Sequence, residues 1–190
     1  MKNFQHLICL AAFCFILTNA RAQNQNDQAM KPWIDYMTPG DQQKMLAKSA
    51  GDWKGDVSTM MNPSQPPMKS QAAVHNEMIM GGRYLSVHYT GNMMGMPFDG
   101  MGTIAYDNGE KKYTQTWIDN MGTGIMYMEG WPAADGKSIE FKGKGYDPMQ
   151  GKEVTMRQVM TFNSDNDQTL ESYTDMNGKE MKTMTIHLTR

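Results

Sequence analysis

Residues 112–131 read KYTQTWIDNMGTGIMYMEGW, and this stretch decides the fold class. Side chains in Lys112–Asp119 alternate between two faces, as they do along a β-strand. Met-Gly-Thr-Gly at 121–124 has the composition of a turn. Alternation then resumes over Gly124–Trp131. Two alternating runs joined by a short glycine-rich turn predict an antiparallel β-hairpin.

The same pattern continues in both directions along the chain. Strong hairpin signals occur at Asn108-Gly109 and Asn177-Gly178. Short strands with hairpin-length connections predict an all-β protein, and an antiparallel up-and-down β-barrel of about ten strands leaves no free sheet edge. A two-layer sandwich is the alternative. The expected strands are Trp53–Met61, Lys69–Met80, Arg83–Gly91, Pro97–Tyr106, Lys112–Asp119, Gly124–Trp131, Ser138–Tyr146, Glu153–Phe162, Thr169–Met176 and Glu180–Thr189.

A short N-terminal helix precedes the strands. Thr38 can cap it, Pro39 suits its first position, and Gly51 ends it. We expect this helix to cover part of the barrel, which spans residues 38–190. Residues 23–37, which begin with the polar run Gln23–Ala29, are expected to form a disordered leader.

The first 22 residues have the form of a secretion signal. Lys2 precedes the apolar run Leu7–Leu17, and Ala20-Arg21-Ala22 places small residues before the expected cleavage site. We therefore expect a secreted or periplasmic protein, cleaved after Ala22, with no stable membrane anchor afterwards. Both cysteines, Cys9 and Cys14, lie in the signal, so the mature chain would have no disulfide.

Composition and motifs narrow the functional classes. The formal net charge is −2 over 190 residues, whereas a general nucleic-acid binder needs a strongly basic face. The sequence contains no Gly-x-Ser-x-Gly elbow, phosphate-binding loop or dinucleotide fingerprint. We therefore expect neither an enzyme nor a nucleic-acid partner, and the sequence names no cofactor.

Several strands mix aromatic and polar side chains on one face, which suits a barrel with an internal cavity. Asp119 has two interpretations: it is a polar anchor for a ligand, or it binds the amides of the following turn. We expect a small, partly apolar ligand. The candidate binding residues are Tyr84, His88, Tyr113, Trp117, Asp119 and Tyr127.

The 22 methionines suggest a second hypothesis. Thioethers are soft ligands that select Cu(I), and the loop Met93-Met94-Gly95-Met96 is the best candidate site. Methionine as adaptable core filler is the alternative. The histidines after the signal, His75, His88 and His187, show no zinc-binding spacing, so we assign no metal ligand. A third hypothesis is a structural module of the cell envelope with a filled barrel.

Gly51-Asp52-Trp53, after the helix, resembles the Gly-x-Trp signature of the calycin barrels. In those proteins an arginine of the last strand packs over the tryptophan, and Arg190 occupies that place here. This resemblance implies structural roles for Gly51, Trp53 and Arg190. It also implies that a barrel of this kind can hold haem through one histidine, for which His88 and His187 are the candidates.

A more specific resemblance covers nearly the whole mature chain. The chain is similar to the bacterial domain-of-unknown-function family 1579, which implies a calycin-like fold and no particular activity. The blocks that match in order are Gly81–Leu85, Gly95–Gly100, Tyr106–Asn108, Trp117–Gly124, Asp147-Pro148 with Gly151-Lys152, and Thr189-Arg190.

Overall fold

The structure is a computed structural model that describes residues 28–61 and 64–190. It divides into one unit that ends at Thr38 and another from Pro39 to Arg190. The expected signal at 1–22 and residues 23–27 of the leader lie outside the described residues. Within the described ranges, no helix has both the length and the apolar character needed to cross a membrane.

Residues 28–37 of the first unit form a helix, which differs from the disordered leader expected over 23–37. Two interactions at helical spacing support it. Lys31 and Asp35 form an ion pair at 2.6 Å, one turn apart. The rings of Trp33 and Tyr36 lie 5.9 Å apart. The side chains of this segment are therefore placed to stabilise helical turns.

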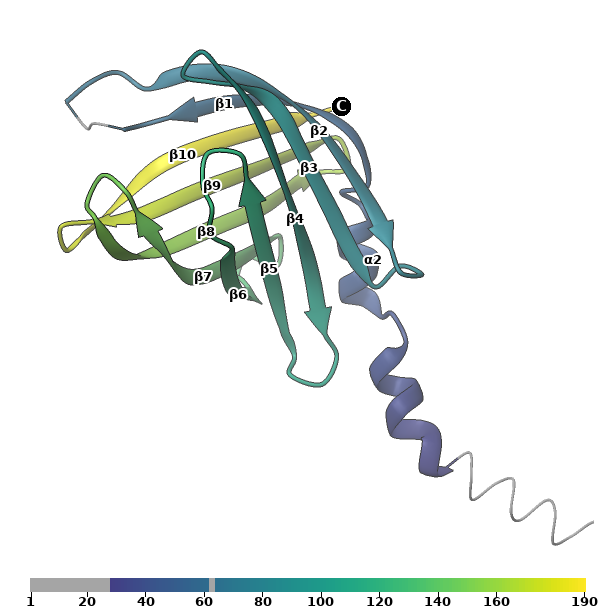
Figure 1. The fold of residues 1–190 in the computed structure, drawn as a ribbon. Helices are drawn as coiled ribbons and strands as arrows, with labels where there is room; N and C mark the ends of the chain where they lie inside the picture. Colours follow the sequence, from purple (N-terminus) through teal and green to yellow (C-terminus); the bar gives the residue numbers. More distant parts are fainter. Residues whose placement is uncertain (1–27, 62–63) are drawn as a thin grey trace, which may run out of the picture. The chain divides into compact units, whose positions relative to one another are not determined.

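The second unit is a closed antiparallel barrel in which each strand pairs with the next and the last pairs with the first (Figure 1). The predicted ten-strand up-and-down barrel is confirmed, and the sandwich alternative is excluded. The strands are β1 (Gly51–Thr59), β2 (Met68–Ile79), β3 (Tyr84–Met93), β4 (Met96–Asp107), β5 (Lys112–Asp119), β6 (Met126–Pro132), β7 (Ser138–Asp147), β8 (Lys152–Ser164), β9 (Asp167–Met176) and β10 (Lys179–Thr189).

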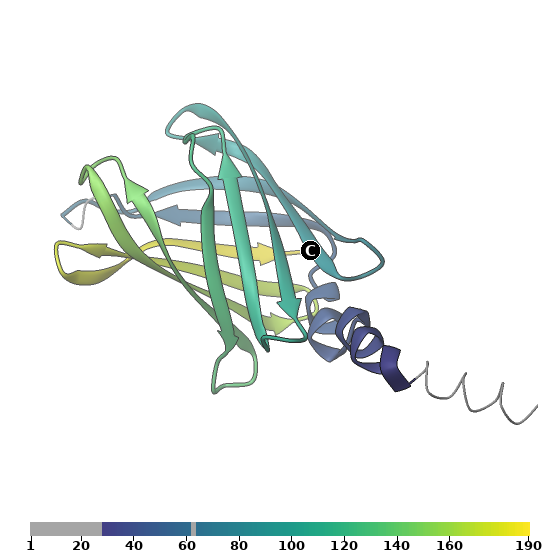
Figure 2. The same cartoon turned by 60° about the horizontal axis from the view of Figure 1, so that its bottom comes forward.

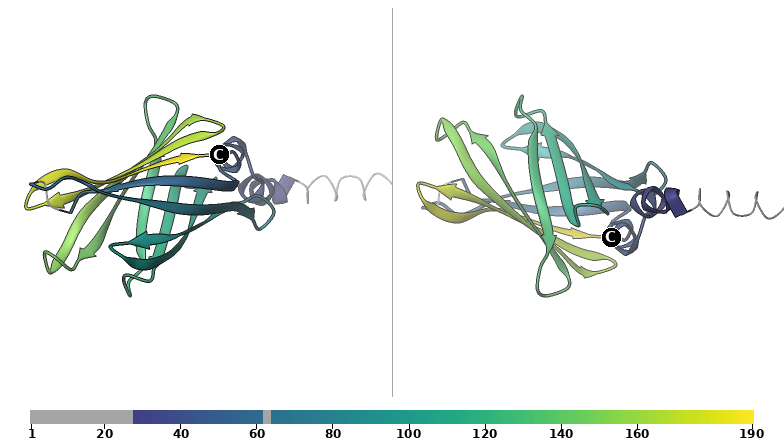
Figure 3. Two further views of the ribbon diagram at one scale, coloured as in Figure 1. Left: turned by 90° about the horizontal axis from the view of Figure 1, so that it is seen from above. Right: turned by 90° about the horizontal axis from the view of Figure 1, so that it is seen from below.

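Figure 2 shows the strands wrapping around a common interior. The barrel closes where β1 runs beside β10, visible as the neighbouring blue and yellow strands in Figure 3. In this pairing Gly55 lies opposite Leu188 and Val57 opposite Ile186. Because closure pairs the first and last strands, the barrel leaves no free edge.

A short helix, α2 (Asp41–Ala47), lies at one end of the barrel, which we call the helix end. Gly40 occupies the N-cap position instead of Thr38, so the predicted cap is wrong by two residues. The physical reason is that the Gln43 side chain accepts a hydrogen bond from the Gly40 N–H at 2.8 Å, which satisfies that end of the helix. Gln43 also donates to the carbonyl oxygen of Tyr106 at 3.0 Å, attaching α2 to the end of β4.

The helix end is sealed where the first and last strands meet. Trp53 is buried and donates from its indole nitrogen to the Ser49 carbonyl oxygen at 2.9 Å. The Arg190 guanidinium lies 4.2 Å from the centre of the Trp53 ring. Gly51 has a φ of +120°, and a Cβ there would lie 3.0 Å from an Arg190 nitrogen. Glycine therefore satisfies both the backbone conformation and the space that Arg190 needs.

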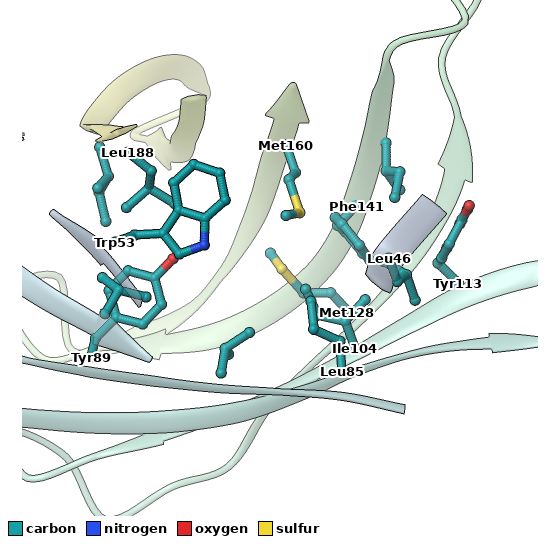
Figure 4. Close-up of a cluster of buried hydrophobic side chains, with 14 residues drawn as sticks. Leu46, Trp53, Leu85, Tyr89, Ile104, Tyr113, Met128, Phe141, Met160 and Leu188 are labelled. Atoms are coloured by element: carbon teal, nitrogen blue, oxygen red, sulfur yellow. The ribbon is translucent and has the colours of Figure 1, made fainter. Parts of the chain in front are cut away.

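The interior beside α2 contains a closely packed group around Tyr113. Tyr113 and Phe141 are fully buried with ring centres 6.3 Å apart, and Leu46 of α2 is buried with them. Figure 4 shows this group beside Met128, with Trp53, Tyr89 and Leu188 gathered on the other side. The fully enclosed aromatic and aliphatic side chains stabilise the fold at this end, and the opposite half is less completely filled.

Candidate functional site

The barrel interior contains a cavity of about 220 Å³. It extends from Leu188 near the helix end to Met93, Asp119 and Met121 at the opposite end, which we call the far end. Its volume is somewhat below the roughly 300–1,000 Å³ of typical ligand pockets, so it suits a small ligand or part of a larger one. The apolar lining residues are Val57, Ala72, Val87, Tyr89, Met93, Phe98, Ile104, Trp117, Met121, Met126, Met160, Leu170, Met184, Ile186 and Leu188.

An aromatic cluster forms one wall. The Tyr89 and Trp117 rings meet edge to face with centres 5.5 Å apart, and Phe98 lies nearly parallel to Trp117 at 6.5 Å. Gly100 makes room for this cluster, since a Cβ there would lie 2.4 Å from the Trp117 ring. Burial raises the pKa of the Tyr89 hydroxyl far above its usual range, so this wall stays uncharged.

Asp119 is the charged residue of the lining. One carboxylate oxygen accepts from the Trp117 indole N–H at 2.8 Å, and the other accepts from the Met121 backbone N–H at 2.9 Å. The second contact is the turn-binding role that the sequence left open as an alternative. Asp119 therefore fixes the Trp117 ring and the turn, and it also faces the cavity.

A layer of amides crosses the interior. Gln115 on β5 donates from Nε2 to Oε1 of Gln158 on β8 at 2.9 Å, although β6 and β7 separate these strands along the barrel wall. Asn76 on β2 donates from Nδ2 to the Ser49 carbonyl oxygen at 3.1 Å. The Asn76 Oδ1 and Gln115 Oε1 atoms are buried and have no hydrogen-bond partner in the described part of the chain.

The structure separates the predicted binding residues into three groups. Trp117 and Asp119 line the cavity. Tyr113 points inward on the same strand but belongs to the packed helix-end core, where its hydroxyl donates to the Gln42 side chain. It does not line the cavity, because β5 begins beside α2 and Tyr113 is its second residue.

Tyr84, His88 and Tyr127 lie on the outer face of the barrel, which corrects the expectation that they line the cavity. In β3 the buried residues are Leu85, Val87 and Tyr89, which alternate with Tyr84 and His88. The apolar set occupies the interior, and a shift of one residue would reverse every side chain of the strand.

In β6 the inward positions are Met126, Met128 and Gly130, so Tyr127 projects outward. Gly130 shares the inner face with Met128, and a glycine is needed there because the Phe141 ring fills the space: a Cβ at Gly130 would lie 2.5 Å from that ring. Sequence reasoning missed Tyr89, Phe98 and the amides Asn76 and Gln158. The sequence did contain a signal for them, because each occupies the same alternate positions as the apolar residues of its strand.

A comparison with family models decides which family the chain belongs to. A family model described as "Protein of unknown function (DUF1579)" matches residues 38–190, which include the whole barrel. The chain belongs to the DUF1579 family. This agrees with the resemblance drawn from the sequence blocks. No curated protein sequence matches the chain significantly.

Two solved structures share the fold of this DUF1579 member. Rv2717c from M. tuberculosis is 15% identical with a TM-score of 0.60, covering 80% of this chain and 99% of its own. The S-type phycobiliprotein lyase CPES from Guillardia theta is 12% identical with a TM-score of 0.55, covering 77% of this chain and 90% of its own. At these identities the likeness concerns the fold alone.

The DUF1579 barrel places its histidines outside the cavity. His75 pairs with Asp52 at 2.6 Å and His88 with Asp99 at 2.8 Å, both on the outer face. His187 pairs with Asp167 at 2.9 Å. Because none of the three lines the cavity, neither His88 nor His187 is placed to hold a haem inside it.

The methionine loop does not converge on a single point. Met93 lines the cavity, and Met96 is its cross-strand partner but is about half exposed. Met94 occupies the turn itself, with a φ of +54°, and is also about half exposed. Among the residues that the structure describes, no cluster of three or more His, Cys, Asp or Glu side chains is placed to hold a metal ion.

Proposed function

We propose that this protein is a non-enzymatic binding protein that holds a small, partly apolar molecule inside its barrel. The supporting observation is the cavity of about 220 Å³ between a packed helix end and the far end. Its wall is mostly apolar and aromatic, with a few polar groups facing the same space, which is the usual composition of a ligand pocket.

The aromatic wall of the cavity is held in position by close packing and by a hydrogen bond. Gly100 leaves the space that the Trp117 ring occupies, and the bond from Trp117 to Asp119 fixes that ring. A structural module of the envelope, our third hypothesis, predicts a filled interior. We place the binding activity outside the cytoplasm, because the first 22 residues have the form of a secretion signal.

The neutral fluorescent probe N-phenyl-1-naphthylamine tests this proposal. We expect saturable 1:1 binding to the full chain. Ala72 lines the cavity, and Ala73 beside it is exposed on the outer face. Ala72→Phe should fill the cavity and abolish binding, and Ala73→Phe should leave it unchanged. Equal binding by both variants, or no binding to the original protein, would contradict the proposal.

Soft-metal binding is a second candidate, because five thioethers line the cavity: Met93, Met121, Met126, Met160 and Met184. Titration with Cu(I) under reducing conditions tests it. Sub-micromolar affinity that is lost when Met93 and Met126 become leucine would support a copper site. Unchanged affinity in that variant, or affinity weaker than micromolar, would identify these methionines as adaptable wall residues.

A further inference from the structure

We propose that the cavity selects neutral or cationic ligands that offer N–H or O–H donors, and that it rejects carboxylates, sulfonates and other anions. The inference rests on the proposed function and specifies its ligand class. Two independent features of the cavity wall support it. A negative charge faces the interior, and two buried amide oxygens can still accept hydrogen bonds.

The described residues that line the cavity carry a negative charge. Asp119 faces the cavity, and the described lining contains no lysine, arginine or histidine. The carboxylate is held in place by the indole of Trp117 and the backbone of Met121, so it cannot easily turn away. An anion entering this apolar space would lose its hydration and meet a like charge, with no cation to compensate.

Two cations on the outer face of the barrel, Arg157 and Lys112, are engaged elsewhere. Arg157 forms two hydrogen bonds to Glu180, at 2.9 and 2.7 Å, and lies over the Tyr173 ring. Lys112 pairs with Glu110 and Glu129, both at 2.6 Å. Recruiting either cation for a bound anion would break these contacts as well as require its side chain to reach the interior.

The amide layer adds a preference for donors. Asn76 and Gln115 are 2% and 7% exposed, and both line the cavity. Each nitrogen donates one N–H, to Ser49 and Gln158 respectively, whereas the two oxygens accept no hydrogen bond in the described structure. A buried acceptor gains from a ligand N–H or O–H, but an ionised carboxylate or sulfonate only accepts and cannot satisfy it.

A matched pair of fluorescent probes tests the inference on the full chain. N-phenyl-1-naphthylamine is neutral and has one N–H donor; 8-anilino-1-naphthalenesulfonate has the same aromatic skeleton with an added sulfonate. We expect the sulfonate probe to bind at least about tenfold more weakly. Asp119→Asn should narrow this ratio by about threefold or more, chiefly by improving binding of the anion.

Asp99→Asn is the matched control, since it removes the same charge from the exposed outer face. It should leave the ratio of the two affinities unchanged. The inference would be overturned if the two probes bound with affinities within about twofold of each other and Ala72→Phe abolished the binding of both. That result would leave the proposed function intact. An unchanged ratio in Asp119→Asn would also overturn the inference. Failure of both probes to bind would contradict the proposed function itself.

Discussion

The guanidinium of Arg190 lies 4.2 Å above the centre of the Trp53 ring, which joins the last strand of the barrel to the first. Arg190 also donates to the carbonyl oxygens of Ala50, at 2.5 Å, and Asp165, at 2.6 Å. One side chain therefore connects β10, the start of β1 and the turn between β8 and β9. This closure supports the packed end against which the cavity is built.

Replacing Arg190 with methionine should reduce the free energy of unfolding by about 1–2 kcal/mol, because charge-assisted hydrogen bonds and the stacking on Trp53 are lost together. Arg190→Lys should recover little of this, since an ammonium lacks the planar fork that reaches several carbonyls. Urea denaturation measures both variants. Full stability of Arg190→Met would show that the seal is not made by this residue.

Gly100→Ala should move the Trp117 ring, because the new methyl group would lie 2.4 Å from it. We expect a stability loss of about 1–3 kcal/mol from overpacking and altered binding of N-phenyl-1-naphthylamine. Gly124→Ala is the control, since no atom lies within 4 Å of a Cβ at that position. Denaturation and probe titration of the two variants should differ clearly, and similar behaviour would refute the packing described for Trp117.

The hydrogen bond between Gln115 and Gln158 can be tested by a double-mutant cycle. Gln158→Leu leaves the Gln115 amide without its partner in a buried layer, which should cost about 1–3 kcal/mol of unfolding free energy. Adding Gln115→Leu should restore part of that loss, because both polar groups are then gone. Strictly additive effects in thermal or urea unfolding would mean that the two side chains do not interact.

The pKa of His75 should lie above that of an ordinary imidazole. Its hydrogen bond to Asp52 is the main reason that the pKa of His75 is raised, and partial desolvation opposes this. The folded state therefore binds this proton more tightly than the unfolded state. The pair stabilises the fold at pH below the ordinary imidazole pKa, and that contribution is lost as the pH rises through the raised pKa.

Titration of the His75 ring by NMR measures this shift directly. Asp52→Asn should bring the pKa of His75 back towards its ordinary value, whereas Asp41→Asn, at the start of α2, should not change it. A His75 pKa that is the same with and without Asp52 would show that the pair does not form in solution.

The strands could be predicted from sequence because alternation and turn chemistry are local properties. Asn108-Gly109 and Asn177-Gly178 mark turns that the structure contains. Closure followed from the number of strands and the need to protect sheet edges. The contact between Arg190 and Trp53, implied by the calycin resemblance, is present in the structure.

The inward face of each strand could not be predicted as well. In β5 the face with Trp117 and Asp119 does point inward, but in β6 the interior receives Met128 and Gly130, and Tyr127 projects outward. The reason lies in packing between strands: the Phe141 ring from β7 fills the space at Gly130. No local pattern in β6 reports the size of a side chain on its neighbour.

Native mass spectrometry of the full-length gene product, purified from the organism that encodes it, tests the central claim most directly. We expect a bound neutral or cationic small molecule that is retained by Ala73→Phe and absent from Ala72→Phe. A bare polypeptide mass for the original protein, together with no binding of N-phenyl-1-naphthylamine, would contradict the claim that this barrel is a small-molecule binding protein.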